Sequence, residues 1–337
     1  MMKTKYYKAI GFAVALGILI WVIWYATSVF LLAFAAILLA ILLNAIGRGA
    51  RKITHLPYPA ALLVALIVIL GIFTLTFWLY SPLIAVQFGL LMDELPQAVA
   101  TLHKNLTPYL STDFLLKMQK EFSLSNQKLL TQLLSVFSTT LGSIAGFIIF
   151  LIVGLYLAFD PPRYVKWILL MIPTKKIERV AEIMNQMGQS LRWWLLGKVF
   201  SMAFVGIFTI IGLSLLHVSL AFILGLLAAL LTFIPYVGAI LASIPAILIG
   251  FTHSPWQAIY VIILYLIIHI IDGYLMTPFI EQRTVSIPPA VTILAQVLMV
   301  ILIGGFGLAL ATPLLVVGVA LVHNTLHRKS MKVVKES

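Results

Sequence analysis

Long apolar runs, separated by short polar or basic stretches, follow one another along the chain. A helix that spans a membrane needs about 20 apolar residues. Runs of suitable length lie at 59–81, 141–159, 199–216 and 256–275. A further run, 9–46, would reach about 57 Å as one helix, nearly twice the hydrocarbon thickness of about 30 Å. We therefore expect it to form a hairpin of two short helices that breaks near Ala26-Thr27-Ser28.

Two apolar stretches, 220–250 and 289–323, are too long for one upright span and too short for two. The first is interrupted by Pro235-Tyr236-Val237-Gly238 and the second by Gly304-Gly305-Phe306-Gly307. Irregular backbone at membrane depth is tolerated only within protein or against a water-filled cavity. We predict broken re-entrant hairpins, with long tilted spans as the alternative. The fold class is thus an all-α, polytopic integral membrane protein with about eight hydrophobic segments.

Two stretches differ from the apolar runs. Residues 83–138 carry four lysines and four acids, with Pro96 and Pro108 as helix breakers, and we expect a helical insertion outside the bilayer after a third segment that ends at Ser81-Pro82. Residues 161–198 hold seven basic residues and three tryptophans, which is typical of a cytoplasmic, amphipathic region at the membrane surface. The predicted divisions are 1–82, 83–138, 139–160, 161–198, 199–323 and a basic tail, 324–337.

The composition excludes several protein classes. Apolar residues make up 62% of the 337-residue chain and charged residues 9%, against about 25% charged in a soluble globular protein. A mean hydropathy of +1.12 leaves too little polar surface for a soluble fold. The absence of cysteine excludes a disulfide scaffold, thiolate metal sites and cysteine nucleophiles.

The net charge of +12 is explained by topology, and we expect no nucleic-acid partner. Eighteen of the 22 Lys and Arg residues lie outside 83–138, in the stretches next to the apolar runs. Lys and Arg gather on the cytoplasmic side of membrane proteins. We therefore place the N- and C-termini in the cytoplasm, with the lipid bilayer as the main partner.

Signatures of soluble enzymes are absent from the sequence. It contains no Walker loop, no GxGxxG after a strand, no HExxH and no GxSxG. We expect neither catalysis, nor a cofactor, nor a metal site. Transport, if it occurs, would use a gradient or a passive path.

Asp272 is the most informative polar position because an acid within a membrane segment is a functional candidate by default. His269 lies three residues earlier, on the same helical face. A carboxylate and an imidazole so placed could relay a proton. The alternative is that Asp272 caps a helix end and His269 packs internally.

The remaining candidates lie at helix breaks and at one segment end. Broken helices expose backbone groups that bind ions and substrates in transporters, although a packing kink explains a break equally well. Lys198 could contact an anionic substrate or simply extend to the cytoplasmic surface. The candidate pathway residues beyond Asp272 and His269 are Pro235, Tyr236, Gly238, Gly304, Gly307 and Lys198.

Three motifs stand out in the second half of the chain: FIPYVG at 233–238 followed by the Ile-Pro-Ala of 244–246, the stretch from Asp272 to Pro278, and GGFGLALATP at 304–313. Together they resemble the motifs of the AI-2E (autoinducer-2 exporter) family of bacterial permeases. The order of segments also matches, including the insertion after the third. The resemblance implies an inner-membrane exporter or permease that forms homo-oligomers. Members of the family are described as exporters of autoinducer-2 or as sodium or lithium–proton antiporters.

The chain departs from the family pattern at three positions. Gly273 stands where Asn is usual, Pro288 where His is common, and Lys198 where Gln is frequent. If the positions of Gly273 and Pro288 help to bind substrate in the family, the substrate of this chain is expected to differ from that of other members. Three hypotheses result: an exporter of a small polar solute, a monovalent cation–proton antiporter, and a membrane scaffold that acts through 83–138.

Overall fold

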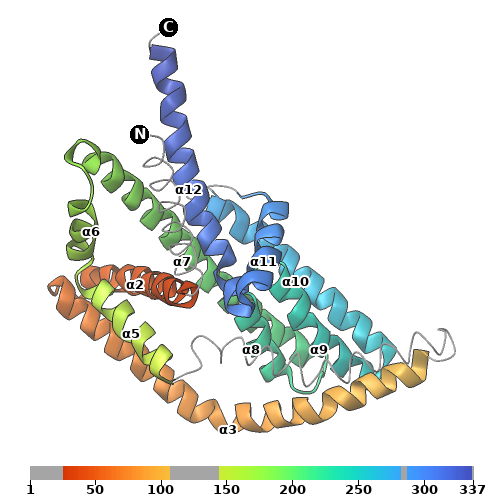
Figure 1. Cartoon of the computed structure of the whole chain (residues 1–337). Helices are drawn as coiled ribbons and strands as arrows, with labels where there is room; N and C mark the ends of the chain where they lie inside the picture. Colours follow the sequence, from red (N-terminus) through yellow and green to blue (C-terminus); the bar gives the residue numbers. More distant parts are fainter. Residues whose placement is uncertain (1–25, 107–143, 282–286, 336–337) are drawn as a thin grey trace, which may run out of the picture.

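The computed structural model describes residues 26–106, 144–281 and 287–335, and this part of the chain is helical and contains no strand (Figure 1). The all-α prediction is therefore confirmed. In chain order the helices are α2 (Thr27–Thr54), α3 (Tyr58–Leu106), α5 (Ile144–Phe159), α6 (Pro161–Leu170), α7 (Ile177–Leu215), α8 (Ala221–Leu231), α9 (Val237–His253), α10 (Pro255–Glu281), α11 (Pro289–Ile303) and α12 (Gly305–Lys335).

Six helical stretches among the described residues are long and apolar enough to cross a membrane. A seventh results if α5 and α6, which meet at 89°, are counted as one bent span. Three shorter apolar helices, α8, α9 and α11, accompany them. The chain is a multi-pass membrane protein. The helix expected before residue 26 and the part of the expected insertion beyond residue 106 lie outside the described residues.

Helix α3 does not end at Ser81-Pro82 as expected but continues to Leu106 (Figure 1). Pro82 has no N–H to offer the carbonyl of Trp78, one turn earlier. The Ser81 hydroxyl lies 3.5 Å from that carbonyl and supplies a donor in its place. Neighbouring serines make prolines tolerable inside membrane helices in this way. The sequence pattern could not reveal this local compensation.

The later part of α3 packs on the C-terminal helices. Tyr80 stacks on Phe222 with ring centroids 5.5 Å apart, and Gln87 accepts a hydrogen bond from the Ile223 N–H at 3.0 Å. Leu91 is buried in the same apolar cluster as side chains of α8 and α9. Residues 83–106 are therefore continuous with the helical bundle.

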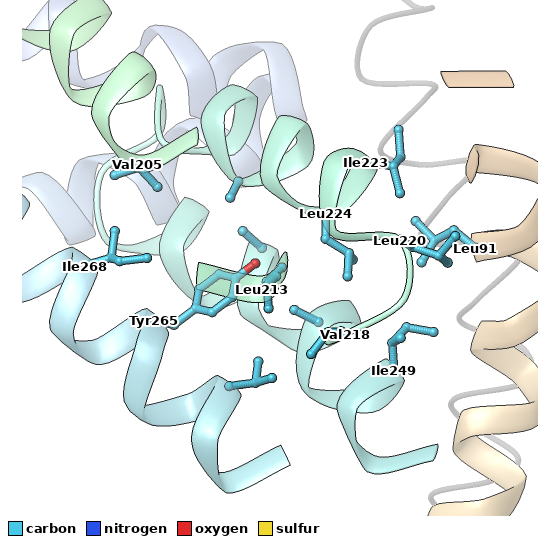
Figure 2. Close-up of a cluster of buried hydrophobic side chains, with 14 residues drawn as sticks. Leu91, Val205, Leu213, Val218, Leu220, Ile223, Leu224, Ile249, Tyr265 and Ile268 are labelled. Atoms are coloured by element: carbon cyan, nitrogen blue, oxygen red, sulfur yellow. The ribbon is translucent and has the colours of Figure 1, made fainter. Parts of the chain in front are cut away.

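Helices α7 and α10 are antiparallel neighbours at the centre of this cluster. Gly212 of α7 lies against Leu264 of α10, while Ser201 bonds to Asp272, so residue numbers rise on one helix as they fall on the other. Figure 2 shows this cluster, to which α3, α7, α8, α9 and α10 all contribute side chains, with the ring of Tyr265 directed into it. These contacts fix the register of the two helices, so that Ser201 of α7 lies opposite Asp272 of α10.

The two interrupted stretches fold back on themselves as predicted. Gly238 at the start of α9 lies against the backbone of Leu231 at the end of α8. Gln296 of α11 reaches Thr312 of α12, although 16 residues separate them, which is about 24 Å along one helix. One long tilted helix is thereby excluded for 289–323, and the pair α8–α9 likewise packs side by side.

Candidate functional site

A carboxylate of α10 is held by a hydroxyl of α7. The Ser201 Oγ lies 2.6 Å from Asp272 Oδ1 and 2.7 Å from Oδ2, and Ser201 itself is only 2% exposed. Asp272 is half-buried, nine residues before the end of α10 at Glu281. It therefore accepts a bond from a neighbouring membrane helix, whereas the alternative of a simple helix cap required it at a helix end.

Two basic side chains lie close to this carboxylate in the fold. Lys198 precedes Ser201 by one turn of α7 and His269 precedes Asp272 by one turn of α10; both are half-buried. The charge of Asp272 acts on both of them, and that of Lys198 acts on His269. His269 Nε2 is buried without a hydrogen-bond partner among the described residues. The structure thus gathers three of the predicted residues, Lys198, His269 and Asp272, into one group.

The same seam between α7 and α10 carries further buried hydroxyl groups. Thr209 is fully buried and Tyr265 is 3% exposed, and neither hydroxyl has a partner among the described residues. Tyr265 lies two turns before Asp272 on the same face of α10, with its ring centroid 6.2 Å from that of His269. Polar groups therefore continue from Asp272 toward the middle of α10.

The first helix break is a strained turn at Pro235–Val237. The Val237 N–H donates to the Pro235 carbonyl at 2.7 Å, and Tyr236 between them has φ 61° and ψ −62°, the geometry of a γ-turn. A side chain at such a positive φ is unfavourable and is often found at functional sites. Gly238 follows, where an added Cβ would lie 1.8 Å from the Leu231 carbonyl oxygen. Only glycine fits there.

The second break depends on glycine for a different reason. Gly304 adopts φ 77° and ψ −159°, a region open essentially to glycine alone. A Cβ on Gly307 would lie 2.5 Å from the Met299 carbonyl oxygen, so close backbone approach follows the turn. Both predicted breaks are therefore tight backbone reversals.

Gln296 of α11 joins the first reversal to helix α12. Its Nε2 donates to the Pro235 carbonyl at 3.1 Å and reaches the Thr312 Oγ1 of α12 at 3.5 Å. Gln296 has no exposed surface, and its Oε1 has no partner among the described residues. The first break, with Pro235, Tyr236 and Gly238, therefore contacts the α11–α12 hairpin through Gln296. Gly304, followed by Gly307, lies at the far end of α11, about 12 Å along the helix from Gln296.

Helix α7 lies between the polar group at Asp272 and the hairpin region. Trp194, one turn before Lys198, makes an edge-to-face contact with Phe233, with centroids 5.8 Å apart. Phe233 immediately precedes the first break. The two regions are thus attached to neighbouring turns of one helix.

Sequence reasoning did not identify Ser201 and Thr312 as site residues and gave Gln296 no role of its own. An amide in an apolar helix is a visible signal for Gln296, because burying it requires hydrogen-bond partners. The partners themselves, a carbonyl 61 residues away and Thr312, follow only from the folded hairpins. Ser201 carried no distinguishing signal, since serine is common in membrane helices.

Chemically, the site offers two kinds of groups. The Asp272 region has a carboxylate, which can bind a proton or a cation, and two basic side chains, which can bind a proton. The Gln296 region has an amide, a hydroxyl and a strained carbonyl, which are uncharged. Among the described residues no three His, Cys, Asp or Glu side chains gather to hold a metal ion.

Comparison with known proteins agrees with the motifs. The sequence profile described as AI-2E family transporter matches residues 11–327. YueF of Bacillus subtilis (strain 168) is 27% identical over 291 residues, which cover 81% of this chain and 78% of YueF. The AI-2 transport protein TqsA of Escherichia coli (strain K12) is 28% identical over 190 residues, 56% of this chain and 54% of TqsA. YrrI of Bacillus subtilis matches over 158 residues at 27% identity, 47% of this chain and 45% of YrrI.

Proposed function

Since the chain belongs to the AI-2E family of transporters, we propose that it is a secondary transporter that exports a small polar solute across the bacterial inner membrane. An autoinducer-2-like solute is the first candidate, because a relative is named for AI-2 transport. Membership of a transporter family accords with a role without catalysis. As the resemblance implies, the unit would be a homo-oligomer.

The observation that carries the proposal is the carboxylate of Asp272, held by Ser201 between two membrane helices. An acid within a membrane segment costs stability, so an acid retained there is a functional candidate by default. Lys198 and His269 lie near Asp272 and can carry positive charge. When Asp272 gains a proton it loses its negative charge, and the electrostatic attraction between it and these two side chains would be lost. A proton gradient would thereby be coupled to movement of the neighbouring hairpins, through α7.

The same group of residues favours a second candidate function, a sodium or lithium–proton antiporter. In that case Asp272 would exchange the cation for the proton directly, and no organic solute would be needed. The carboxylate with a hydroxyl beside it provides oxygen atoms, the ligands that hard cations take. The scaffold hypothesis draws no support from the described residues, and residues 107–138 of its proposed domain lie outside them.

The proposed orientation places both termini and the region from α6 to the start of α7 in the cytoplasm. Helix α6 contains no buried residue and turns 89° away from α5. Asp160 accepts a hydrogen bond from the Arg163 N–H at 3.3 Å and begins α6 at that corner. A helix so placed would lie along the membrane surface with its basic side chains, Arg163 and Lys166, toward the headgroups.

The export proposal is tested in cells. Autoinducer-2 is measured inside and outside bacteria that produce the wild-type chain, Asp272→Asn or Asp160→Asn. Asp160 is an exposed acid at a helix start, where Asn is an equally good cap, so this variant is the matched control. We expect export with the wild type and with Asp160→Asn, and its loss with Asp272→Asn. Equal export by all three would contradict a role for Asp272.

A further inference from the structure

Gln296 has used its donors but not its acceptor. The side-chain amide has two N–H donors and one carbonyl oxygen. The Pro235 carbonyl can only accept a hydrogen bond, so the Gln296 atom that faces it is the nitrogen, Nε2. The Thr312 hydroxyl lies 3.5 Å from the same nitrogen. The oxygen, Oε1, therefore has no partner in the described part of the chain, on a side chain with no exposed surface.

A buried carbonyl oxygen without a donor is energetically unfavourable, and native structures rarely retain one without a reason. Leucine or methionine at this position would fill a similar volume in α11 without that cost. An amide that holds one hairpin by its nitrogen and leaves its oxygen free is suited to accept a hydrogen bond from a molecule that enters between the hairpins.

In the described part of the chain, the polar groups placed near this oxygen, Thr292, Thr312 and the Pro235 carbonyl, carry no charge. Thr292, 5% exposed, lies one turn before Gln296 on the same face of α11, and Thr312 is 6% exposed. The Pro235 carbonyl belongs to the strained turn. The carboxylate and the basic side chains belong instead to the separate α7–α10 group. Amide and hydroxyl groups without a counter-charge favour a ligand that is neutral and rich in hydroxyl groups.

We propose that Gln296 binds the transported solute through Oε1, and that this solute is an uncharged, hydroxyl-bearing small molecule. This inference rests on the proposed export function and divides it between two places: recognition occurs at the crossing of the hairpins, and coupling occurs at Asp272. The described conformation is closed, since Gln296 is buried. Opening requires the α8–α9 and α11–α12 hairpins to separate at the Gln296–Pro235 contact.

The test measures transport kinetics in proteoliposomes with autoinducer-2 as the probe. Gln296→Met keeps the volume and removes the amide. Gln257→Met is the matched control, because Gln257 also donates from Nε2 to a backbone carbonyl of a neighbouring segment, that of Leu216 at 2.8 Å, but is only half-buried and lies away from the hairpin crossing. We expect Gln296→Met to raise the KM for autoinducer-2 about tenfold, the effect of one lost hydrogen bond, and Gln257→Met to leave KM unchanged.

A second variant distinguishes lost binding from a folding defect caused by removal of the Gln296–Pro235 bond. Thr312→Val removes a neighbouring hydroxyl but leaves the Gln296–Pro235 bond in place, and we expect KM to rise in the same direction. Binding is measured independently as stabilisation of the purified protein by autoinducer-2 on heating. We expect stabilisation of the wild type and of Gln257→Met, and its loss in Gln296→Met.

The outcomes separate this inference from the export proposal. If the wild type transports autoinducer-2 and both hairpin variants retain its KM, the binding role of Gln296 is overturned while export stands. If the wild type neither transports nor is stabilised by autoinducer-2, the export proposal fails and the inference fails with it. A raised KM in Gln296→Met or Thr312→Val, with an unchanged control, supports the inference.

Discussion

The Ser201 hydroxyl lies within 2.7 Å of both carboxylate oxygens of Asp272, across the contact between α7 and α10. One hydroxyl hydrogen is thus shared by two acceptors, and the carboxylate is fixed relative to α7. A change in the charge of Asp272 would therefore alter its hydrogen bond to α7 directly. Because α7 also contacts the hairpin region through Trp194, the Ser201–Asp272 bond connects the proposed coupling residue to the proposed recognition region.

Replacement of Ser201 by alanine should weaken both stability and coupling. The hydrogen bond to a charged partner within a membrane bundle is worth about 1–2 kcal/mol. Ser201→Ala should therefore lower the melting temperature in detergent and reduce proton-coupled transport, whereas Ser214→Ala, at an exposed position of the same helix, should do neither. Equal behaviour of the two variants would argue against the bond as a coupling element.

Alanine at Gly238 should prevent correct formation of the first hairpin. Its Cβ would overlap the Leu231 carbonyl oxygen, and backbone cannot move aside as a side chain can. We expect destabilisation by about 3 kcal/mol or more, seen as poor yield of monodisperse protein. Gly273→Ala is the control: a Cβ there meets no atom within 4 Å, and alanine favours the helix by about 1 kcal/mol. A well-folded Gly238→Ala protein would contradict the close approach.

Alanine at Gly304 tests backbone conformation alone. A Cβ at Gly304 meets no atom within 4 Å, so any cost arises from φ 77° and ψ −159°. Such strain amounts to about 1–3 kcal/mol. Thermal unfolding should detect it for Gly304→Ala and not for Gly318→Ala, where an added Cβ also meets no atom and the residue lies within α12. Equal melting temperatures would remove the need for glycine at this turn.

Single cysteines can locate α6, because the chain contains no cysteine of its own. Lys166 and Ile168 project from nearly opposite sides of this helix. If α6 lies along the bilayer surface, Lys166→Cys should react with a membrane-impermeant maleimide in liposomes and Ile168→Cys should be protected. Equal reaction at both positions would place α6 in water, away from the membrane.

The sequence was informative wherever one residue type determines the local backbone. Pro235, Gly238 and Gly304 marked the reversals because proline and glycine limit or extend backbone conformation in ways visible from sequence alone. The run of α3 through Pro82 was not predicted, since it depends on the Ser81 hydroxyl reaching one carbonyl.

Pairings across the fold were the part that could not be predicted. His269 and Asp272 could be placed on one face because they are close in sequence. The approach of Lys198 and Ser201 to Asp272 depends on the register between α7 and α10, which apolar packing such as that of Gly212 against Leu264 determines. The same holds for Gln296, whose partners come from two other helices.

The central claim, that Asp272 couples transport to a gradient, is tested most directly in tight liposomes that hold the purified protein, a pH-sensitive dye and labelled autoinducer-2. A pH gradient is imposed, and solute and proton movements are recorded together for the wild type, Asp160→Asn and Asp272→Asn. The account predicts linked solute and proton fluxes in the first two and loss of both in Asp272→Asn. Proton movement driven by Na⁺ or Li⁺ alone, again lost in Asp272→Asn, would favour the antiporter. Linked fluxes that persist in Asp272→Asn would contradict the account.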